Sequence, residues 1–192
     1  MADNAIELPQ LNIQTMCLKV IGDSPLVCHR FSEKAKKQIL DKQMKKAKGA
    51  KEAKDPQADY EASLYPHPDG GYGFPAIGLK AAAVSACRNV DGITMTMARQ
   101  AFHIPCELVV IDGEPEMRED MVRLNGKTAD IRYRGAFNEW STEFDVRFDA
   151  NVISVEQLVN LFNIAGFAVG IGEHRPERSG SWGMFHIATE DS

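Results

Sequence analysis

The chain has 192 residues, of which 44% are apolar and 26% are charged, and its formal net charge is −5. This length suits one well-buried domain with a large insertion better than two very small domains. The composition is that of an ordinary soluble globule, without a run of about 18 uncharged apolar residues that could span a bilayer. Because the first residues lack the basic start and apolar core of a signal peptide, we predict a cytoplasmic protein without membrane attachment.

The net charge hides an asymmetry along the chain. Ten of the 22 basic residues and three of the 27 acidic ones lie between Arg30 and Lys54, so that segment carries +7 and the rest −12. Binding responds to the local potential within about a Debye length, so an acidic protein can still present a basic arm to nucleic acid. The alternative is a solvated lysine-rich helix that favours solubility.

The first predicted elements surround this basic segment. Residues 6–22 alternate between apolar and polar types and predict a strand. A short extended piece, 25–30, leads into a helix over 31–48 that Ser32 caps. The apolar face of this helix is thin, so it would not fold well alone. Residues 49–65 are polar and are predicted to be mobile.

The middle of the chain is predicted to contain one core helix and one strand region. Residues 66–75 are rich in glycine and proline and predict turns. A helix with small apolar residues follows over 76–89. Residues 93–111 favour strand structure interrupted by Pro105, and 114–127 is a charged excursion.

The last third supplies the remaining elements. Residues 131–148 alternate well and predict a strand, or a hairpin with a turn near Asn138. Ser154 caps a predicted helix over 155–164, and 184–188 is the last strand. With the insertions set aside, the order is that of an α+β fold with a ferredoxin-like, RRM-like βαββαβ core. Such a core leaves one face of its sheet free, and in RNA-recognition modules that face binds single strands.

A glycine-rich loop lies between the second core helix and the last strand. Its 18 residues from Gly166 to Gly183 hold five glycines, two arginines, a histidine and a tryptophan. Glycine lets a backbone approach a ligand, arginine offers a fork for phosphate, and Trp182 or Tyr72 offers a stacking face. This combination favours nucleic acid. The alternative is an ordinary connecting loop, with Gly166 as a helix C-cap.

Three features together resemble the RAMP superfamily, the repeat-associated proteins of CRISPR effector complexes. They are the Pro-Leu-x-x-His-Arg entry into the basic segment, the order of the core elements, and the pattern G-x-G-E-x-R-P-x-x-S-G-x-x-G-x-F over 170–185. Within the superfamily the chain looks most like the backbone subunit that polymerises along guide RNA, or a stand-alone phage-type relative. On this resemblance, residues 1–192 are one RAMP-like domain with a basic, partly mobile insertion over 30–65.

The resemblance implies a binding site in two parts. The glycine-rich loop would contact the nucleic-acid backbone, and Trp182 would stack a base. The insertion would lie against the guide or target strand. The implied residues are Gly170, Gly172, His174, Arg175, Arg178, Gly180, Trp182 and Gly183 of the loop, and Arg30, Lys34, Lys37, Lys45 and Lys46 of the insertion. The implied partners are single-stranded nucleic acid, further copies of the chain in a head-to-tail assembly, and other effector subunits in antiviral defence.

Two other functions remain open on the sequence alone. Some RAMP relatives are guide-processing ribonucleases, and His29 and His174 lie in loops where a general acid or base could act. Asp112 and Asp120 are isolated carboxylates that we interpret as surface charges, not as metal ligands. The third possibility is a structural protein of a phage or mobile element. Deleting residues 33–54 separates the binding function from the structural one. Loss of nucleic-acid binding with assembly intact supports the binding subunit, whereas loss of assembly without any affinity for nucleic acid supports the structural protein.

The cysteines carry no chemistry in this interpretation. They are scattered, without a CxxC pair or a histidine at ligand spacing. We therefore predict four reduced, buried side chains, with neither disulfides nor a metal or other cofactor. The residues are Cys17, Cys28, Cys87 and Cys106.

Overall fold

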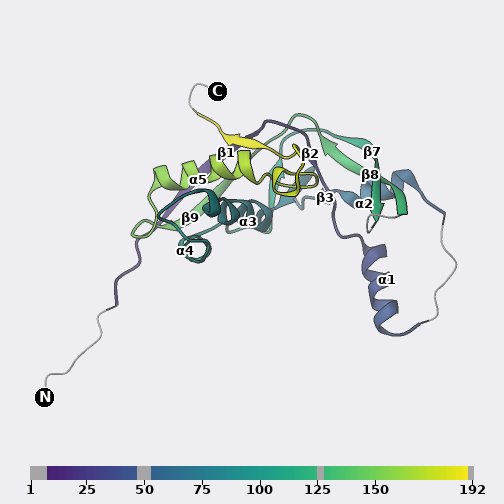
Figure 1. Ribbon diagram of the computed structural model, residues 1–192, viewed down its shortest axis with the longest axis horizontal. Helices are drawn as coiled ribbons and strands as arrows, with labels where there is room; N and C mark the ends of the chain where they lie inside the picture. Colours follow the sequence, from purple (N-terminus) through teal and green to yellow (C-terminus); the bar gives the residue numbers. More distant parts are fainter. Residues whose placement is uncertain (1–7, 47–52, 125–127, 190–192) are drawn as a thin grey trace, which may run out of the picture.

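A computed structural model describes residues 8–46, 53–124 and 128–189 of the chain. It has helices and three antiparallel sheets, which confirms the α+β class. Figure 1 shows an elongated, arched molecule, with the largest sheet and two long helices towards one end and a β-hairpin towards the other. No helix in these described residues is long and apolar enough to cross a membrane.

The largest sheet has four strands. In spatial order they are β10 (Phe185–Ile187), β1 (Ile13–Gly22), β9 (Ser141–Asp149) and β5 (Phe102–His103), and each pair of neighbours is antiparallel. The predicted alternation on β9 is confirmed, because Phe144, Val146 and Phe148 are buried while the residues between them are exposed. Period-two burial of this kind means that one face of the sheet lies on the core.

Two helices lie on the buried face of this sheet. They are α3 (Ala76–Ala86), followed by the short helix η1 (Cys87–Asn89), and α5 (Val155–Ala168). Phe162 of α5 packs against both Phe102 and Phe144 of the sheet, with ring centroids 5.9 Å apart in each case. The predicted cap of α5 is confirmed, since Ser154 forms a full capping box with Gln157.

The opposite face of the four-stranded sheet is mostly polar. Its exposed side chains on β1 and β9 are Ile13, Thr15, Cys17, Lys19, Glu143, Asp145 and Arg147. Lys19 pairs in register with Glu143, and Thr15 with Arg147. These seven positions hold no aromatic ring on which a base could stack.

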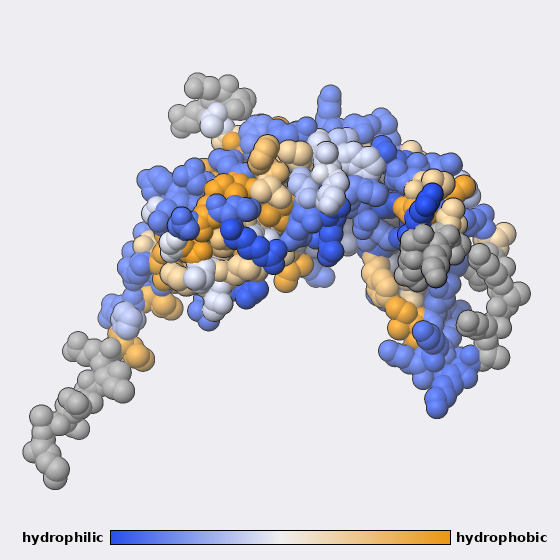
Figure 2. Space-filling view, viewed as in Figure 1, coloured by the Kyte–Doolittle hydropathy of each residue, from blue (hydrophilic) through white to orange (hydrophobic). Residues whose placement is uncertain are grey.

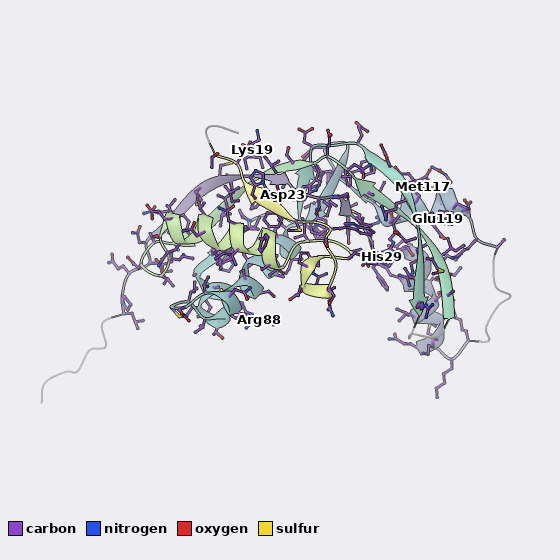
Figure 3. The ribbon with its side chains drawn as sticks, turned by 45° about the horizontal axis from the view of Figure 1, so that its top comes forward. Lys19, Asp23, His29, Arg88, Met117 and Glu119 are labelled. Carbon is purple, nitrogen blue, oxygen red and sulfur yellow. The ribbon has the colours of Figure 1, made fainter. Side chains whose placement is uncertain are left out.

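Two smaller sheets complete the fold. One consists of β2 (Leu26–Val27), β8 (Thr128–Phe137) and β7 (Pro115–Leu124), in that order. The other consists of β3 (Tyr65–Pro66), β4 (Tyr72–Pro75) and β6 (Leu108–Ile111). Figure 3 shows His29 between the body that carries Lys19 and the β7–β8 hairpin that carries Met117 and Glu119.

Three segments differ from the sequence prediction. Residues 95–101 form helix α4 (Met95–Ala101) instead of a strand, because Thr94 caps it and Ala98 and Ala101 turn into the core. The charged excursion is strand β7, whose ten residues all pair with β8. The segment predicted to be mobile contains helix α2 (Pro56–Ser63), with Asp55 as its cap and proline at its first position.

Three smaller corrections concern single features. The turn near Asn138 is present, but β8 and β9 on either side of it belong to different sheets and do not form a hairpin. Gly166 lies inside α5 and is not its cap, because the helix continues to Ala168. Glycine is needed there because a Cβ would collide with the carbonyl of Phe185 on β10. Cys28 and Cys87 are buried as predicted, whereas Cys17 and Cys106 are exposed.

Helix α1 (Glu33–Gln43) stands apart from the rest of the fold. Its predicted cap is confirmed, since Ser32 accepts a hydrogen bond from the backbone N–H of Ala35 at 3.2 Å. None of its residues is buried, and Figure 1 shows it projecting from the hairpin end of the molecule. We call residues 33–46 the arm.

Candidate nucleic-acid interface

The glycine-rich loop is a folded structure anchored to the start of the chain. It leaves α5 at Gly170, whose φ of +67° places it in the left-handed region that favours glycine. The backbone N–H of Ile171 donates to Gly183 at 2.9 Å, and that of Gly183 donates to Pro25 at 2.8 Å. The short helix η2 (Pro176–Arg178) lies between these two points. The loop therefore has a fixed shape beside β2.

The other loop glycines permit close contacts within the protein. A Cβ on Gly172 would lie 2.6 Å from the carbonyl oxygen of Val27. A Cβ on Gly180 or Gly183 would collide with the carbonyl of His174 or Ile171, respectively. Backbone packing alone thus requires glycine at these positions, and their contact with nucleic acid stays a prediction.

Trp182 is held between two side chains. The guanidinium of Arg118, from β7, lies 4.0 Å from the centroid of the Trp182 ring, a cation–π contact. The ring of His174 meets Trp182 edge-on, with centroids 4.7 Å apart. A base that stacks on the ring face under Arg118 must therefore displace this arginine.

The two loop arginines differ in how far their side chains are already engaged within the protein. Arg175 donates to the carbonyl of Gly172 at 3.1 Å and to the Glu177 carboxylate at 2.9 Å through Nη2, so much of its fork is engaged. Arg178 and His174 are exposed. Of the predicted loop residues, these two are the best placed to meet a phosphate from solvent.

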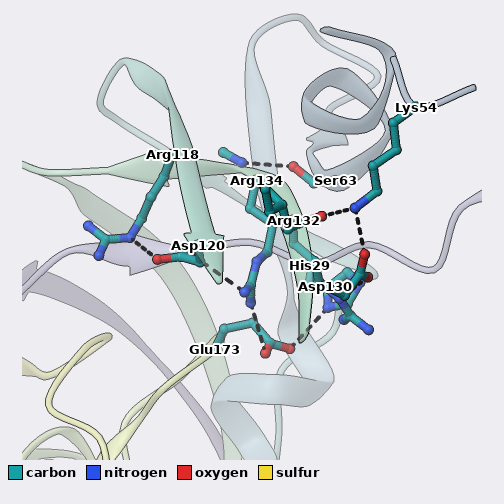
Figure 4. A network of polar contacts seen from close by, with 11 residues as sticks. His29, Lys54, Ser63, Arg118, Asp120, Asp130, Arg132, Arg134 and Glu173 are labelled. Atoms are coloured by element: carbon teal, nitrogen blue, oxygen red, sulfur yellow. Dashed lines mark hydrogen bonds and ion pairs between the residues drawn. The ribbon is translucent and has the colours of Figure 1, made fainter. Parts of the chain in front are cut away.

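A buried arginine links the loop to the β7–β8 hairpin (Figure 4). Arg134, on β8, is only 2% exposed. Its Nη1 donates to Oε2 of Glu173 in the loop at 3.1 Å, and its Nη2 lies 3.6 Å from Oδ2 of Asp120 on β7. Asp120 accepts a further hydrogen bond from Arg118 at 2.9 Å. The charges of this cluster therefore largely neutralise one another.

The register of the hairpin brings these residues together. Arg118 pairs with Arg134, and Asp120 with Arg132, so all four side chains project from the same face of the hairpin. That face turns towards the loop, where Glu173 supplies the second carboxylate for Arg134. A single long hairpin therefore positions one side of the site.

Glu173 also contacts His29, which follows β2. Nδ1 of His29 lies 3.3 Å from Oε1 of Glu173, where it donates a hydrogen bond. This hydrogen bond, opposed by partial burial and aided by the charges of His29 and Arg134, lowers the pKa of Glu173 to about 2. A histidine held by a carboxylate is also the arrangement of a general base with its orienting group.

Two cavities meet at His29. One, of about 180 Å³, is lined by His29, Arg30, Ser32, Lys54, Arg132 and Arg134 together with Asp59 and Asp130. The other, of about 240 Å³, lies between the loop and α3. Lys54 and Arg132 both approach Asp130, at 2.7 and 3.9 Å. In the first cavity cations outnumber carboxylates, which favours an anionic ligand.

The structure brings only part of the predicted site together. Arg30 directly follows His29, which contacts Glu173 of the loop. The Nε of Arg30 donates to the carbonyl of Ala62 at 3.3 Å. The predicted lysines Lys34, Lys37, Lys45 and Lys46 lie on the exposed arm, which Figure 1 shows leading away from the loop. Within the described residues, Lys46 pairs with Asp41 at 2.9 Å, whereas Lys37 and Lys45 form no ion pair.

The sequence prediction missed the hairpin half of the site. Arg118, Asp120, Arg132, Arg134 and Glu173 were not among the predicted binding residues. A signal was available on β8, where Asp130, Arg132 and Arg134 recur at every second position, as the charged face of a strand would require. Asp120 is paired with arginines, and Asp112 bonds Ser141 through its backbone. The described residues hold no group of three or more potential metal ligands.

The depressed pKa of Glu173 predicts a dependence of stability on pH. A carboxyl group whose pKa is lower in the folded state stabilises the fold above its unfolded pKa of about 4.3 and loses that contribution as the pH falls towards 2. We expect urea midpoints of the wild type to fall faster over this window than those of Glu173→Gln. Parallel pH profiles of the two proteins would contradict this role for Glu173.

Comparison with known proteins supports one conclusion, about the fold. No protein-family model matches the chain, and no curated protein matches it. A chain of the type III-B Cmr-beta complex, solved by cryo-electron microscopy with cognate target RNA, is similar at 10% identity with a TM-score of 0.51. The match covers 92% of this chain and 59% of that one, so the chain spans less than two thirds of that protein.

A second solved structure is similar over its whole length. It is Cmr6 from Pyrococcus furiosus, at 9% identity with a TM-score of 0.45, and the match covers 93% of this chain and 100% of that one. At 10% identity, the comparison with the Cmr-beta chain shows a shared fold. The protein has a RAMP-like fold.

Proposed function

We propose that this protein is an RNA-binding subunit of a type III-like CRISPR effector complex that assembles along a single strand. Its RAMP-like fold supports this function, because the similar Cmr-beta chain belongs to a complex bound to target RNA. The observation that carries the proposal is the cation-lined cavity at Arg30 and Arg132, which opens beside the glycine-rich loop at the base of the lysine-rich arm.

The proposed mechanism is binding without chemistry. The exposed lysines of the arm and the exposed Arg178 and His174 would contact phosphates and release counterions, which gives an affinity that falls steeply with salt. The buried Arg134 would not contact the strand. It would hold the loop against the hairpin, so that the contacting groups are fixed before the strand arrives. Sequence preference should be weak.

The proposed core consists of β1, α3, β5, β9, α5 and β10. The strand order β10-β1-β9-β5, with α3 and α5 on one face, supports a ferredoxin-like βαββαβ core into which residues 30–65 are inserted. On β1 and β9 the open face of this sheet carries two acidic residues and no aromatic ring among seven exposed positions. We therefore place the strand at the loop and the arm, and not on the open face that RNA-recognition modules use.

A ribonuclease is the second candidate, and one observation favours it. His29 is oriented by Glu173 at the junction of the two cavities, as a general base would be. Its other ring nitrogen would take the proton of the attacking 2′-hydroxyl of a bound RNA. The leaving oxygen would need a proton from a second group, and His174, which is exposed in the same loop and meets Trp182 edge-on, is the candidate for that role.

Fluorescence anisotropy with a labelled 30-nucleotide single strand, as RNA and as DNA, tests the proposed function. We expect the logarithm of the affinity to fall linearly with the logarithm of the salt concentration, with a slope of about 0.7 per phosphate contact. Gel analysis of the same samples should show an intact strand, whereas shortened RNA would favour the ribonuclease. Absence of binding to either strand at low salt would reject nucleic-acid binding altogether.

A further inference from the structure

Helix α3 turns small side chains towards the glycine-rich loop. The residues of this helix that line the cavity of about 240 Å³ are spaced i, i+3, i+4 and i+7, so they share one face of the helix; they are Gly78, Ala81, Ala82 and Ser85. The loop supplies residues 169–172 to the same cavity. Small residues on both elements thus leave space between them. We call this cavity the α3 chamber.

Two aromatic rings complete the apolar part of the α3 chamber. Tyr65 and Phe74 both line it, with their ring centroids 6.2 Å apart. Arg175 and Glu177 line it too and bond each other at 2.9 Å, so donors and acceptors are available at its edge. Rings, small side chains and a few polar groups together suit a planar heterocycle such as a nucleobase.

Cations outnumber carboxylates in the neighbouring cavity of about 180 Å³, which we call the cation chamber. Arg30 lines it and forms no ion pair within the described residues. Lys54 and Arg132 line it as well, and both approach Asp130. Arg134 lines it at 2% exposure, and its Nε has no hydrogen-bond partner in the described part of the chain. A buried donor without an acceptor is unfavourable, and a phosphate oxygen is an acceptor that would satisfy it.

One pair of side chains lies where the chambers meet. His29 lines both chambers, and Figure 4 shows the Glu173 carboxylate between His29, at 3.3 Å, and Arg134, at 3.1 Å. A carboxylate can accept hydrogen bonds from ribose hydroxyls. The combined volume falls within the range of roughly 300–1,000 Å³ that small-molecule sites occupy. Figure 2 shows mainly hydrophilic side chains over the middle of the arch, where a polar ligand would approach.

We propose that the two chambers bind one free nucleoside 5′-monophosphate, with its base in the α3 chamber, its ribose at Glu173 and its phosphate in the cation chamber. This inference goes beyond the proposed function and shares with it only the cation-lined cavity. A phosphodiester inside a strand carries a sugar on each side. A terminal phosphate has three free oxygens, so it can enter further, towards Nε of Arg134.

Isothermal titration calorimetry with the four ribonucleoside 5′-monophosphates, AMP, GMP, CMP and UMP, tests this site. The parallel probes are the matching nucleosides and inorganic phosphate. We expect at least one nucleotide to bind about 10-fold or more tightly than both its nucleoside and phosphate, because only the nucleotide occupies both chambers. If every nucleotide binds no more tightly than phosphate, the proposal is overturned.

Two variants assign the parts of the nucleotide to the chambers. Ala81→Leu places a larger side chain, also a good helix former, at the α3 chamber. It should weaken nucleotide binding about 10-fold or more and leave phosphate binding unchanged, whereas Arg132→Ala should weaken both. The matched controls are Ala58→Leu, exposed on α2, and Arg147→Ala, exposed on β9, and both should bind like the wild type. Nucleotide binding that Ala81→Leu leaves intact would overturn the assignment of the base.

The same chemistry occurs at the 5′-phosphorylated end of a strand, so the variants are also titrated with labelled single strands. Ala81→Leu should bind a strand like the wild type, with or without a 5′-phosphate. If it weakens only the phosphorylated strand, the site belongs to a strand end and not to a free nucleotide, which overturns the proposal. Failure of the proposed function would differ, because strand binding would then be absent while nucleotide binding persists.

Discussion

Replacing Arg134 with alanine is expected to lower the free energy of unfolding by about 3 kcal/mol, because it leaves two carboxylates without their shared buried partner. Arg134 is 2% exposed and lies between Glu173 of the loop and Asp120 of β7. For a domain of this size the loss corresponds to a fall of roughly 6–12 °C in the melting temperature. Urea unfolding followed by circular dichroism measures it.

Arg132→Ala is the matched control for this prediction. Arg132 projects from the same face of β8, two residues away, but its side chain is 33% exposed and its nearest carboxylate is 3.9 Å away. Exposed pairs of this kind contribute about 0–1 kcal/mol. If both variants lose the same small amount of stability, the loop is not held by Arg134. Backbone contacts, such as the hydrogen bond from Gly183 to Pro25, would then be what anchors the loop.

Replacing two lysines of the arm should weaken binding to a single strand without changing the fold. Lys37 and Lys45 are exposed, and neither forms an ion pair within the described residues. For Lys37→Gln/Lys45→Gln we expect the slope of log affinity against log salt to become shallower by about 1.4, from ~0.7 per lost phosphate contact. The affinity at 0.1 M salt should fall roughly 25-fold on the same relation. Anisotropy titrations at several salt concentrations measure both quantities.

A variant with the same change of charge elsewhere separates local contact from net charge. Lys19 and Arg99 are exposed on the body, on β1 and α4, away from the arm and the loop. Lys19→Gln/Arg99→Gln should leave the slope within error of the wild type. Equal losses in the two double variants would mean that the strand responds only to overall charge, and the arm would then have no special part in binding.

The parts of the fold that the sequence predicted are those with a strong internal pattern. Ser154 and Gln157 spell a capping box, and the apolar residues of β9 recur at every second position, so the helix and the strand could be located without tertiary contacts. The short strand β5 lies within the region 93–111 that was predicted as strand, but its bounds could not be located, because two residues carry no periodicity and it exists only by pairing with β9.

The hairpin was missed for a different physical reason. Strand β7 has charged residues on both of its faces, so it lacks the alternation by which a half-buried strand is recognised. What stabilises it is the full ladder with β8, a long-range feature that local composition does not record. The part of the site that depends on this hairpin, Arg118, Asp120 and Arg134, was lost with it. The loop and the arm were found because glycine spacing and lysine density are local signals.

The most direct test of RNA binding with assembly is to purify the protein at low salt and measure its absorbance ratio at 260 and 280 nm. The sample is then sized before and after digestion with RNase or with DNase. We predict co-purifying nucleic acid in particles of several sizes, which RNase collapses to small species. A nucleic-acid-free particle of one fixed size would contradict the proposal and favour a structural assembly protein.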